Sequence, residues 1–268
     1  NHSLYPEYNS IMDSTGIEWR NVMGNHDMTN YGRSFEGSTC DYEKMYGPSY
    51  YSFNVGKVHY IVLNDNFYVG KDWYYIGYLT EQQLSWMERD LSYVGKDKKV
   101  VVSLHIPTTL REWDRTGYNF NFSHIADVMC NRKAVYDILA PYDALILSGH
   151  THTGNNEIIA ENLMEQNVTS LGGAWWCGPV CVDGGPAGYK IYNFDGTDVK
   201  WRFAGCDTGE NCQMKVYWDA ESFPDEVVAN VWDYDPQWKV EYFEDGGKVC
   251  DMKRFEGKDP YASEVYRN

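Results

Sequence analysis

Apolar and polar positions follow one another along the chain in patterns that predict both helices and strands. The clearest helix is expected over residues 80–93, where apolar side chains recur at helical spacing after a capping-box pattern that begins at Thr80. Further helices are expected at residues 5–16 and 131–140, which end at a glycine and before a proline. These three segments precede Gly154, so helices are expected mainly before that residue.

Strands are expected where short apolar runs lead into polar turns. Residues 19–23, 99–104 and 143–148 each form such a run. Residues 107–128 are expected to be irregular. Residues 50–55 and 58–64 flank a Gly-Lys pair and predict a β-hairpin, and the second of them is apolar on both faces, as in a central strand. Because strands and helices alternate, the fold class is expected to be α/β with a layered core.

The pattern changes after Gly154, where helical periodicity fades and short strands separated by Gly, Asn and Asp follow. The polar segment 205–213 has the composition of a linker. Beyond it, alternating strands interrupted by two prolines predict a small all-β region. We therefore expect two domains, residues 1–204 and residues 205–268.

Composition and charge narrow the class of protein. The 268 residues, of which 43% are hydrophobic, can bury a substantial core. The excess of 39 acidic over 23 basic side chains gives a net charge of −16, which argues against nucleic acid and anionic membranes as partners. No run approaches the roughly 20 apolar residues that span a bilayer, so no transmembrane segment is expected in this chain.

The seven cysteines leave redox state and compartment open. Their number is odd and no C-x-x-C spacing occurs, which excludes a zinc ribbon or a thioredoxin-like motif. Cys177 with Cys181 and Cys206 with Cys212 are close enough in sequence to pair in an oxidising compartment, and unpaired thiols are an equal alternative. A periplasmic, envelope or secreted location is favoured, and the sequence does not indicate an oligomeric state.

Four of the seven histidines lie in turns that follow apolar strands: His26, His105, His150 and His152. A lone histidine in such a turn is more often structural, but here three separate strands each end in one. In an extended turn, residues i and i+2 project to the same side, so His150 and His152 are expected to point into one site. Because imidazole is a common ligand of zinc and iron, the pattern indicates a metal site.

The residues GNHD, a lone His after an apolar strand and GHTH, in that order, resemble the third, fourth and fifth signature blocks of the calcineurin-like metallophosphoesterases. The resemblance covers residues 19–203. It implies a calcineurin-like β-sandwich flanked by helices and the hydrolysis of phosphate esters at two adjacent metal ions. The tail from Cys206 resembles, more weakly, the small C-terminal β domain of some bacterial members.

The resemblance also implies which side chains bind the metals. Asn25, His105 and His150 match ligands of one ion, and His152 matches a ligand of the other. These ions would be divalent or trivalent and of the Mn, Fe or Zn class.

The same resemblance assigns the catalytic groups. His26 matches the family's catalytic histidine, which contacts the phosphoryl group and protonates the leaving oxygen, and Asp27 would orient it. The implied substrate is a small phosphate ester, because the metals dominate the local field despite the acidic surface.

The family's first two blocks, Asp-x-His and Gly-Asp, do not occur in the 23 residues that precede Gly24, which contain Asp13 as their single aspartate. One metal therefore keeps three of its four ligands and the other keeps one of four. We expect that the gene product is longer, with the two blocks encoded upstream, and that this segment alone is inactive. The alternative is a variant that has lost catalysis and kept the scaffold.

Three further residues are candidates for substrate binding. Trp175 and Trp176 lie in a glycine-rich run that either forms one wall of the substrate cleft or packs beneath the sheet. Arg111 could bind phosphate as a bidentate fork. The runner-up function is a non-catalytic module, in which the aromatic-rich loop and the β appendage hold a glycan or a protein partner.

Overall fold

The computed structural model describes residues 2–29, 33–70, 74–110, 122–209 and 211–266. These form two compact units, which are described separately. Unit 1 is Asn1–Thr151, Ile159–Gln166 and Phe194–Asp198, and unit 2 is His152–Ile158, Asn167–Asn193 and Val199–Asn268. The expected division between residues 204 and 205 stays a prediction.

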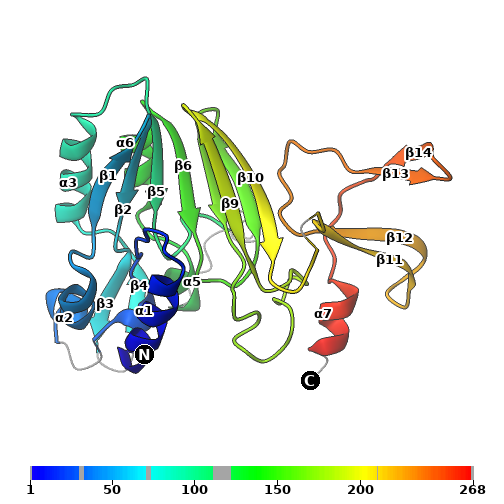
Figure 1. Cartoon of the computed structure of the whole chain (residues 1–268), viewed down its shortest axis with the longest axis horizontal. Helices are drawn as coiled ribbons and strands as arrows, with labels where there is room; N and C mark the ends of the chain where they lie inside the picture. The colour runs from blue at the N-terminus through cyan, green and yellow to red at the C-terminus, as the bar shows by residue number, and fades with distance from the viewer. Residues whose placement is uncertain (1, 30–32, 71–73, 111–121, 210, 267–268) are drawn as a thin grey trace. The chain divides into compact units, whose positions relative to one another are not determined.

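Helices and strands alternate up to about residue 150 and strands prevail afterwards (Figure 1). The helices are η1 His2–Leu4, α1 Tyr5–Ser14, η2 Asn25–Asp27, α2 Phe35–Tyr46, α3 Glu81–Leu91, α5 Phe122–Asp127, α6 Arg132–Leu139 and α7 Pro260–Val265. The strands are β1 Tyr51–Val55, β2 Val58–Val62, β3 Asn66–Gly70, β4 Tyr74–Gly77, β5 Lys99–Ser103, β6 Asp143–Ser148, β7 Asn155–Ala160, β8 Leu163–Asn167, β9 Gly188–Asp195, β10 Asp198–Gly205, β11 Met214–Ala220, β12 Phe223–Val231, β13 Glu241–Glu244 and β14 Gly247–Asp251.

A six-stranded sheet of order β1-β2-β5-β6-β8-β7 organises the mixed α/β fold. Strands β2, β5 and β6 are parallel and in register, with Val62 opposite Ser103 and Ser103 opposite Leu147. Their carboxyl ends therefore meet at one edge of the sheet. The loops that follow these three strands carry the chemistry described below, as expected for parallel strands in α/β proteins.

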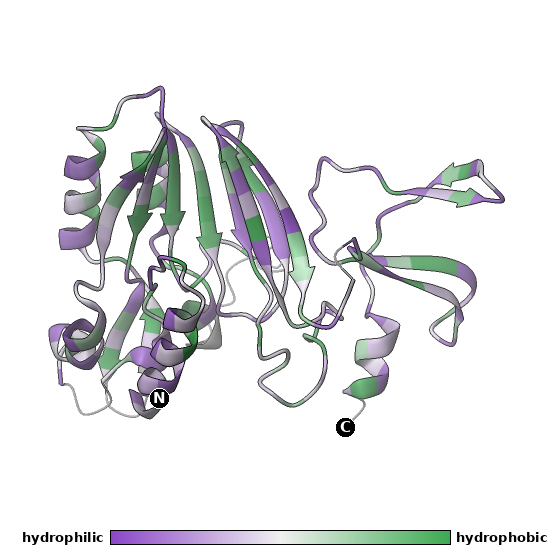
Figure 2. Cartoon of the chain, viewed as in Figure 1, coloured by the Kyte–Doolittle hydropathy of each residue, from purple (hydrophilic) through white to green (hydrophobic). Residues whose placement is uncertain are grey.

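The core of unit 1 lies between the sheet and two helices. Apolar residues of α3 and α6 pack with the inward side chains of β2, β5 and β6, which Figure 2 shows as hydrophobic strands. Fully buried members include Ile61, Met87, Val102, Leu139 and Ile146. Burial of such aliphatic and Met side chains stabilises the sheet by about 1.5–3 kcal/mol each, so the core fixes the strand ends on which the site is built.

Most of the expected elements of unit 1 are present. The hairpin is β1 and β2, paired antiparallel, and the helices expected at 5–16, 80–93 and 131–140 are α1, α3 and α6. The capping box of α3 is only half formed: the Thr80 side chain accepts from the Gln83 N–H, whereas the Gln83 side chain donates to the Asn64 carbonyl at 2.7 Å. Gln83 thus ties the helix to the end of β2.

Two expectations for unit 1 are wrong. Residues 19–23 do not form a strand, because the Met23 carbonyl accepts from the Asn66 side chain at 2.7 Å rather than from a neighbouring strand. Residues 107–128, expected to be irregular, include α5. The pattern also gave no sign of α2, whose buried residues are Ser38, Thr39 and Tyr42 rather than aliphatic side chains.

Unit 2 is rich in β-structure, as expected. Strands pair antiparallel in β11–β12 and β13–β14, and β9 pairs with β10. Pro224 lies inside β12 rather than interrupting it, since a strand of a two-stranded ribbon has an edge on which a missing N–H is tolerated. Helix α7 was not expected; the Asp259 side chain caps it by accepting from the Ala262 N–H at 2.8 Å. All seven cysteines have free thiols in this structure, and pairing in an oxidising compartment stays a prediction.

Candidate metal centre

The turn that carries Asn25 and His26 is fixed by an aspartate within it. The Asp27 carboxylate accepts from the Gly24 N–H at 2.9 Å and from the Tyr5 hydroxyl at 3.0 Å, which ties the turn to α1. Burial, together with the neighbouring Asp27 charge, raises the pKa of Tyr5, so its hydroxyl remains a donor. This arrangement buries Asn25 and leaves His26 exposed.

Three of the side chains expected to be metal ligands converge in unit 1. The Asn25 Oδ1 atom lies 2.8 Å from His105 Nε2, and His150 Nδ1 lies 3.1 Å from the same nitrogen. Donor atoms bound to one first-row ion at about 2.0–2.2 Å have neighbours at about 3 Å, so the spacing fits one metal ion. Within the described residues, no group of three or more His, Cys, Asp and Glu is placed to hold a metal. This cluster instead combines two imidazoles with an amide oxygen.

Close packing holds the His105 ring in this cluster. A Cβ atom added to Gly24 would lie 3.2 Å from His105 Cε1, so glycine lets the turn backbone approach the ring. The His105 and His150 rings meet edge to face, with centroids 4.8 Å apart. Contacts within the protein therefore hold the two imidazole rings in place.

The far nitrogen of the His150 ring faces polar groups that were not foreseen. His150 Nε2 lies 3.5 Å from the Asp127 carboxylate and 3.5 Å from the Tyr75 hydroxyl. Burial, with the nearby Asp127 charge, raises the pKa of Tyr75 to about 12. A carboxylate behind an imidazole favours a proton on the nitrogen that faces it, which leaves Nδ1 to bind a metal.

Asp65 holds the backbone around His105. It lies just after β2, is fully buried, and accepts from the N–H groups of His105 at 3.1 Å and Ile106 at 2.9 Å. Burial raises the pKa of the Asp65 carboxyl to about 8, although these two donors favour its charged form. An acidic residue directly after an apolar strand was the signal in the sequence that could have identified it.

Glu165 joins the two loops that carry the histidines. This side chain from β8 is 1% exposed and accepts from the Thr108 N–H at 2.9 Å and the Ser148 hydroxyl at 2.7 Å, and it also bonds the Thr108 hydroxyl. Burial raises its pKa to about 7, while these hydrogen bonds lower it. Nothing in the sequence near Glu165 indicated this role, because its partners are far away along the chain.

The remaining expected site residues are in unit 2 or outside the described chain. The backbone at His150 and His152 is not extended, because φ is 71° and 57° at these residues. The prediction of an extended turn is therefore wrong. The Thr151 N–H donates to the Gly149 carbonyl at 2.8 Å, which closes a three-residue turn around His150. Arg111 lies outside the described residues.

The aromatic pair belongs to unit 2 and is presented to solvent. Trp175 stacks on the His152 ring with centroids 5.0 Å apart and is 54% exposed, and Trp176 is 82% exposed. Both have positive φ, 50° and 60°, which non-glycine residues adopt rarely and at a cost. A pair held in this conformation with exposed rings is typical of a binding surface and not of a buried core.

Comparison with known proteins identifies both halves of the chain. Residues 2–154 match the model of the calcineurin-like phosphoesterase family, and residues 165–268 match the model described as the C terminal of calcineurin-like phosphoesterase. The chain is 25% identical over 141 residues to purple acid phosphatase 15 of Arabidopsis thaliana, a match that covers 49% of this chain and 24% of that protein.

Among solved structures, the crystal structure of a dimetal phosphatase from Danio rerio is similar, with a TM-score of 0.40 and 17% identity over 60% of this chain and 63% of that one. The matches therefore span less than two thirds of either relative. Among the described residues, no helix has the length and apolar character needed to cross a membrane.

Proposed function

The chain belongs to the calcineurin-like phosphoesterase family, and we propose that the full-length protein hydrolyses small phosphate esters with metal ions, one of them held by Asn25, His105 and His150. The observation that carries the proposal is the convergence of Asn25 Oδ1 and His150 Nδ1 on His105 Nε2, at 2.8 and 3.1 Å. Two imidazole nitrogens and an amide oxygen at this spacing are a donor set that Mn, Fe and Zn accept.

A second ion would take His152 as a ligand, as the family resemblance implies. When bound, such a pair of ions supplies Lewis acidity at a phosphoryl oxygen and a nucleophile at neutral pH. The chain's own part is to select the tautomer in which the donor nitrogen of each histidine keeps its lone pair. The contacts of His150 with Asp127 and of His152 with the Gly173 carbonyl, at 2.9 Å, support that part because each favours one tautomer.

His26 is proposed to give the proton that the leaving oxygen needs. Its exposed ring follows Asn25 in the same short turn, so a phosphoryl group bound beside Asn25 would be within reach of it. Imidazole ordinarily titrates near neutrality and suits general acid catalysis at that pH. Asp27, which fixes the turn through Gly24 and Tyr5, is proposed to act by orienting His26.

Trp175 and Trp176 are proposed to contact the organic part of the substrate, and Arg111 its phosphate. Exposed indole rings offer large, rigid apolar faces, and a guanidinium group binds phosphate in a bidentate manner. The net charge of −16 favours a small ester over a polyanion such as a nucleic acid. Whether the ester is a monoester or a diester is a question for the assay.

The test measures metal binding and turnover side by side. The purified chain, and a version that also carries any upstream residues of the open reading frame, are titrated with Mn²⁺ and assayed with p-nitrophenyl phosphate and bis-p-nitrophenyl phosphate. In the version that turns over substrate, His26→Ala is expected to lower kcat by about 10²–10⁴-fold with Mn²⁺ affinity unchanged, whereas His150→Ala is expected to lose both turnover and Mn²⁺ binding. The exposed Lys133→Ala variant on α6 serves as the control.

Two outcomes would contradict the proposal. Absence of Mn²⁺ uptake and of turnover in both versions would leave the non-catalytic alternative. Equal activity of the wild type and His150→Ala would place the reaction elsewhere in the protein.

A second candidate function is a binding module, favoured by a groove of about 1090 Å³ in unit 2. Its lining includes Trp232, Tyr234, Trp238 and Phe255, and the Arg254 guanidinium lies 4.5 Å from the Tyr234 ring centroid. Aromatic faces combined with polar groups suit a glycan. Trp238→Ala is expected to abolish binding on a glycan array if this function is correct, and absence of any bound glycan by the wild type would exclude it.

A further inference from the structure

Within unit 2, the turn that begins at His152 is held at three residues, His152, Gly154 and Asn156. His152 Nδ1 lies 2.9 Å from the Gly173 carbonyl, and the Gly154 N–H donates to Asp183 Oδ2 at 2.7 Å. A Cβ atom on Gly154 would lie 2.9 Å from the Trp232 carbonyl. The turn therefore contacts residues that lie later in the sequence, Gly173, Asp183 and Trp232.

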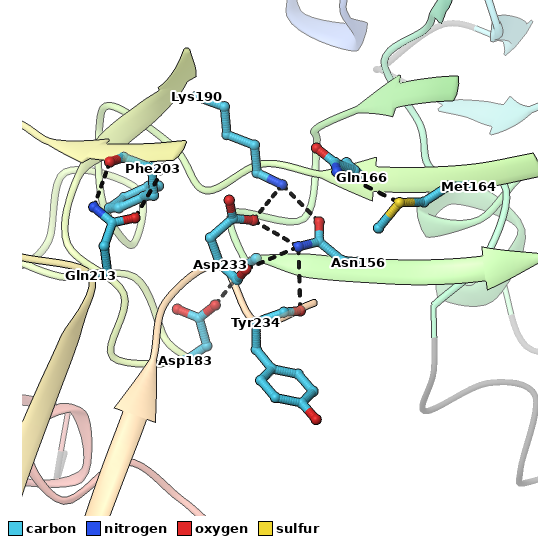
Figure 3. A network of polar contacts seen from close by, with 10 residues as sticks. Asn156, Met164, Gln166, Asp183, Lys190, Phe203, Gln213, Asp233 and Tyr234 are labelled. Carbon is cyan, nitrogen blue, oxygen red and sulfur yellow. Dashed lines mark hydrogen bonds and ion pairs between the residues drawn. The ribbon is translucent and has the colours of Figure 1, made fainter. Parts of the chain in front are cut away.

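The third of these residues, Asn156, belongs to a buried polar network (Figure 3). The Asn156 side chain donates to Asp233 Oδ1 at 2.7 Å and to the Tyr234 carbonyl at 3.3 Å, and its oxygen accepts from Lys190 at 2.7 Å. Lys190 also pairs with Asp233 Oδ1 at 2.6 Å, with both side chains almost fully buried. Asn156 thus lies between a lysine from β9 and the segment that follows β12.

The two charged groups of this network, Lys190 and Asp233, are buried together as an ion pair. Burial lowers the pKa of Lys190, and the adjacent Asp233 charge opposes that shift. Asp233 Oδ2 has no hydrogen-bond partner among the described residues, so the pair is not optimised for stability alone. Buried ion pairs are often no more stabilising than apolar packing, and a role in fixing one conformation is the better-supported use.

The loop that carries Asp183 and Trp175 rests on the C-terminal residues as well. The Asn230 side chain donates to the Asp183 carbonyl and to Asp259 Oδ2, both at 2.8 Å. Gly184, with φ 80°, packs so closely that a Cβ atom would lie 2.2 Å from Asp259 Cγ. The Tyr266 hydroxyl bonds the Val180 carbonyl. A residue of β12, Asn230, and the two residues that cap α7, Asp259 and Tyr266, therefore hold this loop in place.

We propose that the C-terminal residues act as a brace for His152: Asp233 through Asn156, and Asn230 and Asp259 through Asp183. These are positioning residues, because they act through the turn and the loop that contact the His152 ring. The Gly173 carbonyl can only accept, so Nδ1 carries the hydrogen and Nε2 keeps its lone pair for a metal. The ligand role of His152 rests on the proposed function, whereas the brace itself does not.

The experiment reads the His152 ring directly in the metal-free chain. ¹⁵N–¹H correlation spectra of the histidine rings report the tautomer, and hydrogen exchange with mass spectrometry reports opening of residues 150–160. Asn156→Ala and Asp183→Asn are expected to mix the His152 tautomers and to speed exchange in this segment about tenfold. Lys248→Met, which removes an exposed ion pair with Glu241 elsewhere in unit 2, is the matched control.

A second arm adds Mn²⁺. Both variants are expected to weaken, by about tenfold, the same binding event that His152→Ala removes. Wild-type tautomer and exchange in both variants would overturn the brace. Failure of the wild type to bind Mn²⁺ would overturn the proposed function while the metal-free spectra still decide the brace. If Asn156→Ala also speeds exchange in β2 and β5, it has lost its fold, and the milder Asp183→Asn variant decides.

Discussion

Replacing Glu165 by glutamine tests whether the carboxyl group of this buried residue is largely protonated in the folded protein. A protonated carboxyl and an amide share shape and hydrogen-bonding capacity: each keeps an oxygen for the Thr108 N–H and the Ser148 hydroxyl and points a donor at the Thr108 hydroxyl. The Thr108 hydroxyl lies 2.6 Å from the Tyr136 hydroxyl, so it can accept from one side and donate to the other. At pH 5, where the acid is mostly protonated, Glu165→Gln is therefore expected to match the wild type within about 1 kcal/mol.

The pH dependence follows from the pKa of Glu165, which is raised from 4.5 to about 7. Because the folded state binds this proton more tightly than the unfolded state, the free energy of unfolding falls as the pH rises between these two values. Each pKa unit of this shift corresponds to about 1.4 kcal/mol. The free energy of unfolding of the wild type is therefore expected to fall by about 2–3 kcal/mol, through this group, between pH 5 and pH 8. The glutamine variant does not lose it and is expected to be the more stable protein at pH 8.

Urea unfolding at pH 5 and pH 8 with EDTA measures the free energy of unfolding of the wild type and of Glu165→Gln. The difference between the two proteins is the quantity compared, because other groups titrate in both. Glu161→Gln, on the exposed turn between β7 and β8, is the control and should follow the wild type. Parallel pH dependences for the wild type and Glu165→Gln would refute the reasoning. A variant that is less stable than the wild type at pH 8 would show that the loops require the carboxylate.

Three further changes have outcomes set by the geometry. Gly24→Ala places a methyl group 3.2 Å from His105 Cε1 and is expected to weaken Mn²⁺ binding about tenfold; unchanged affinity in calorimetry would show that the ring can move away freely. Asp127→Asn removes the charge behind His150 and is expected to weaken binding 10–100-fold, with a smaller effect counting against that role. Trp176→Ala removes an 82% exposed ring and is expected to raise KM about tenfold, worth about 1.4 kcal/mol, with kcat unchanged; a loss in kcat alone would exclude simple substrate binding.

The sequence predicted the parts of the fold that depend on local pattern. Aliphatic periodicity identified α3 and β5, and the histidines that follow β5 and β6 were identified as candidate ligands, whose ring nitrogens lie 3.1 Å apart in the structure. The pattern failed where burial is polar: α2 buries Ser38 and Thr39, which carry no hydrophobic signal. It also failed at residues 19–23, which have the composition of a strand but no strand partner among the described residues.

The hydrogen bonds of the groups that support the site could not be predicted from the sequence, for a different reason. Glu165 and Thr108 are 57 residues apart, and Asp65 and Ile106 are 41 apart, so their bonds depend on the sheet order and not on spacing along the chain. The positive φ of His150 and His152 likewise could not be predicted from their spacing, because positive φ is uncommon for any residue other than glycine. Local pattern can identify candidate ligands, whereas the groups that orient them require the fold.

The central claim is that Asn25, His105 and His150 hold one metal ion, and anomalous scattering from crystals grown with Mn²⁺ tests it most directly. A peak about 2.0–2.2 Å from Asn25 Oδ1, His105 Nε2 and His150 Nδ1 is the predicted result. A peak bound by other residues, or none at these three atoms when Mn²⁺ is in large excess, would contradict it.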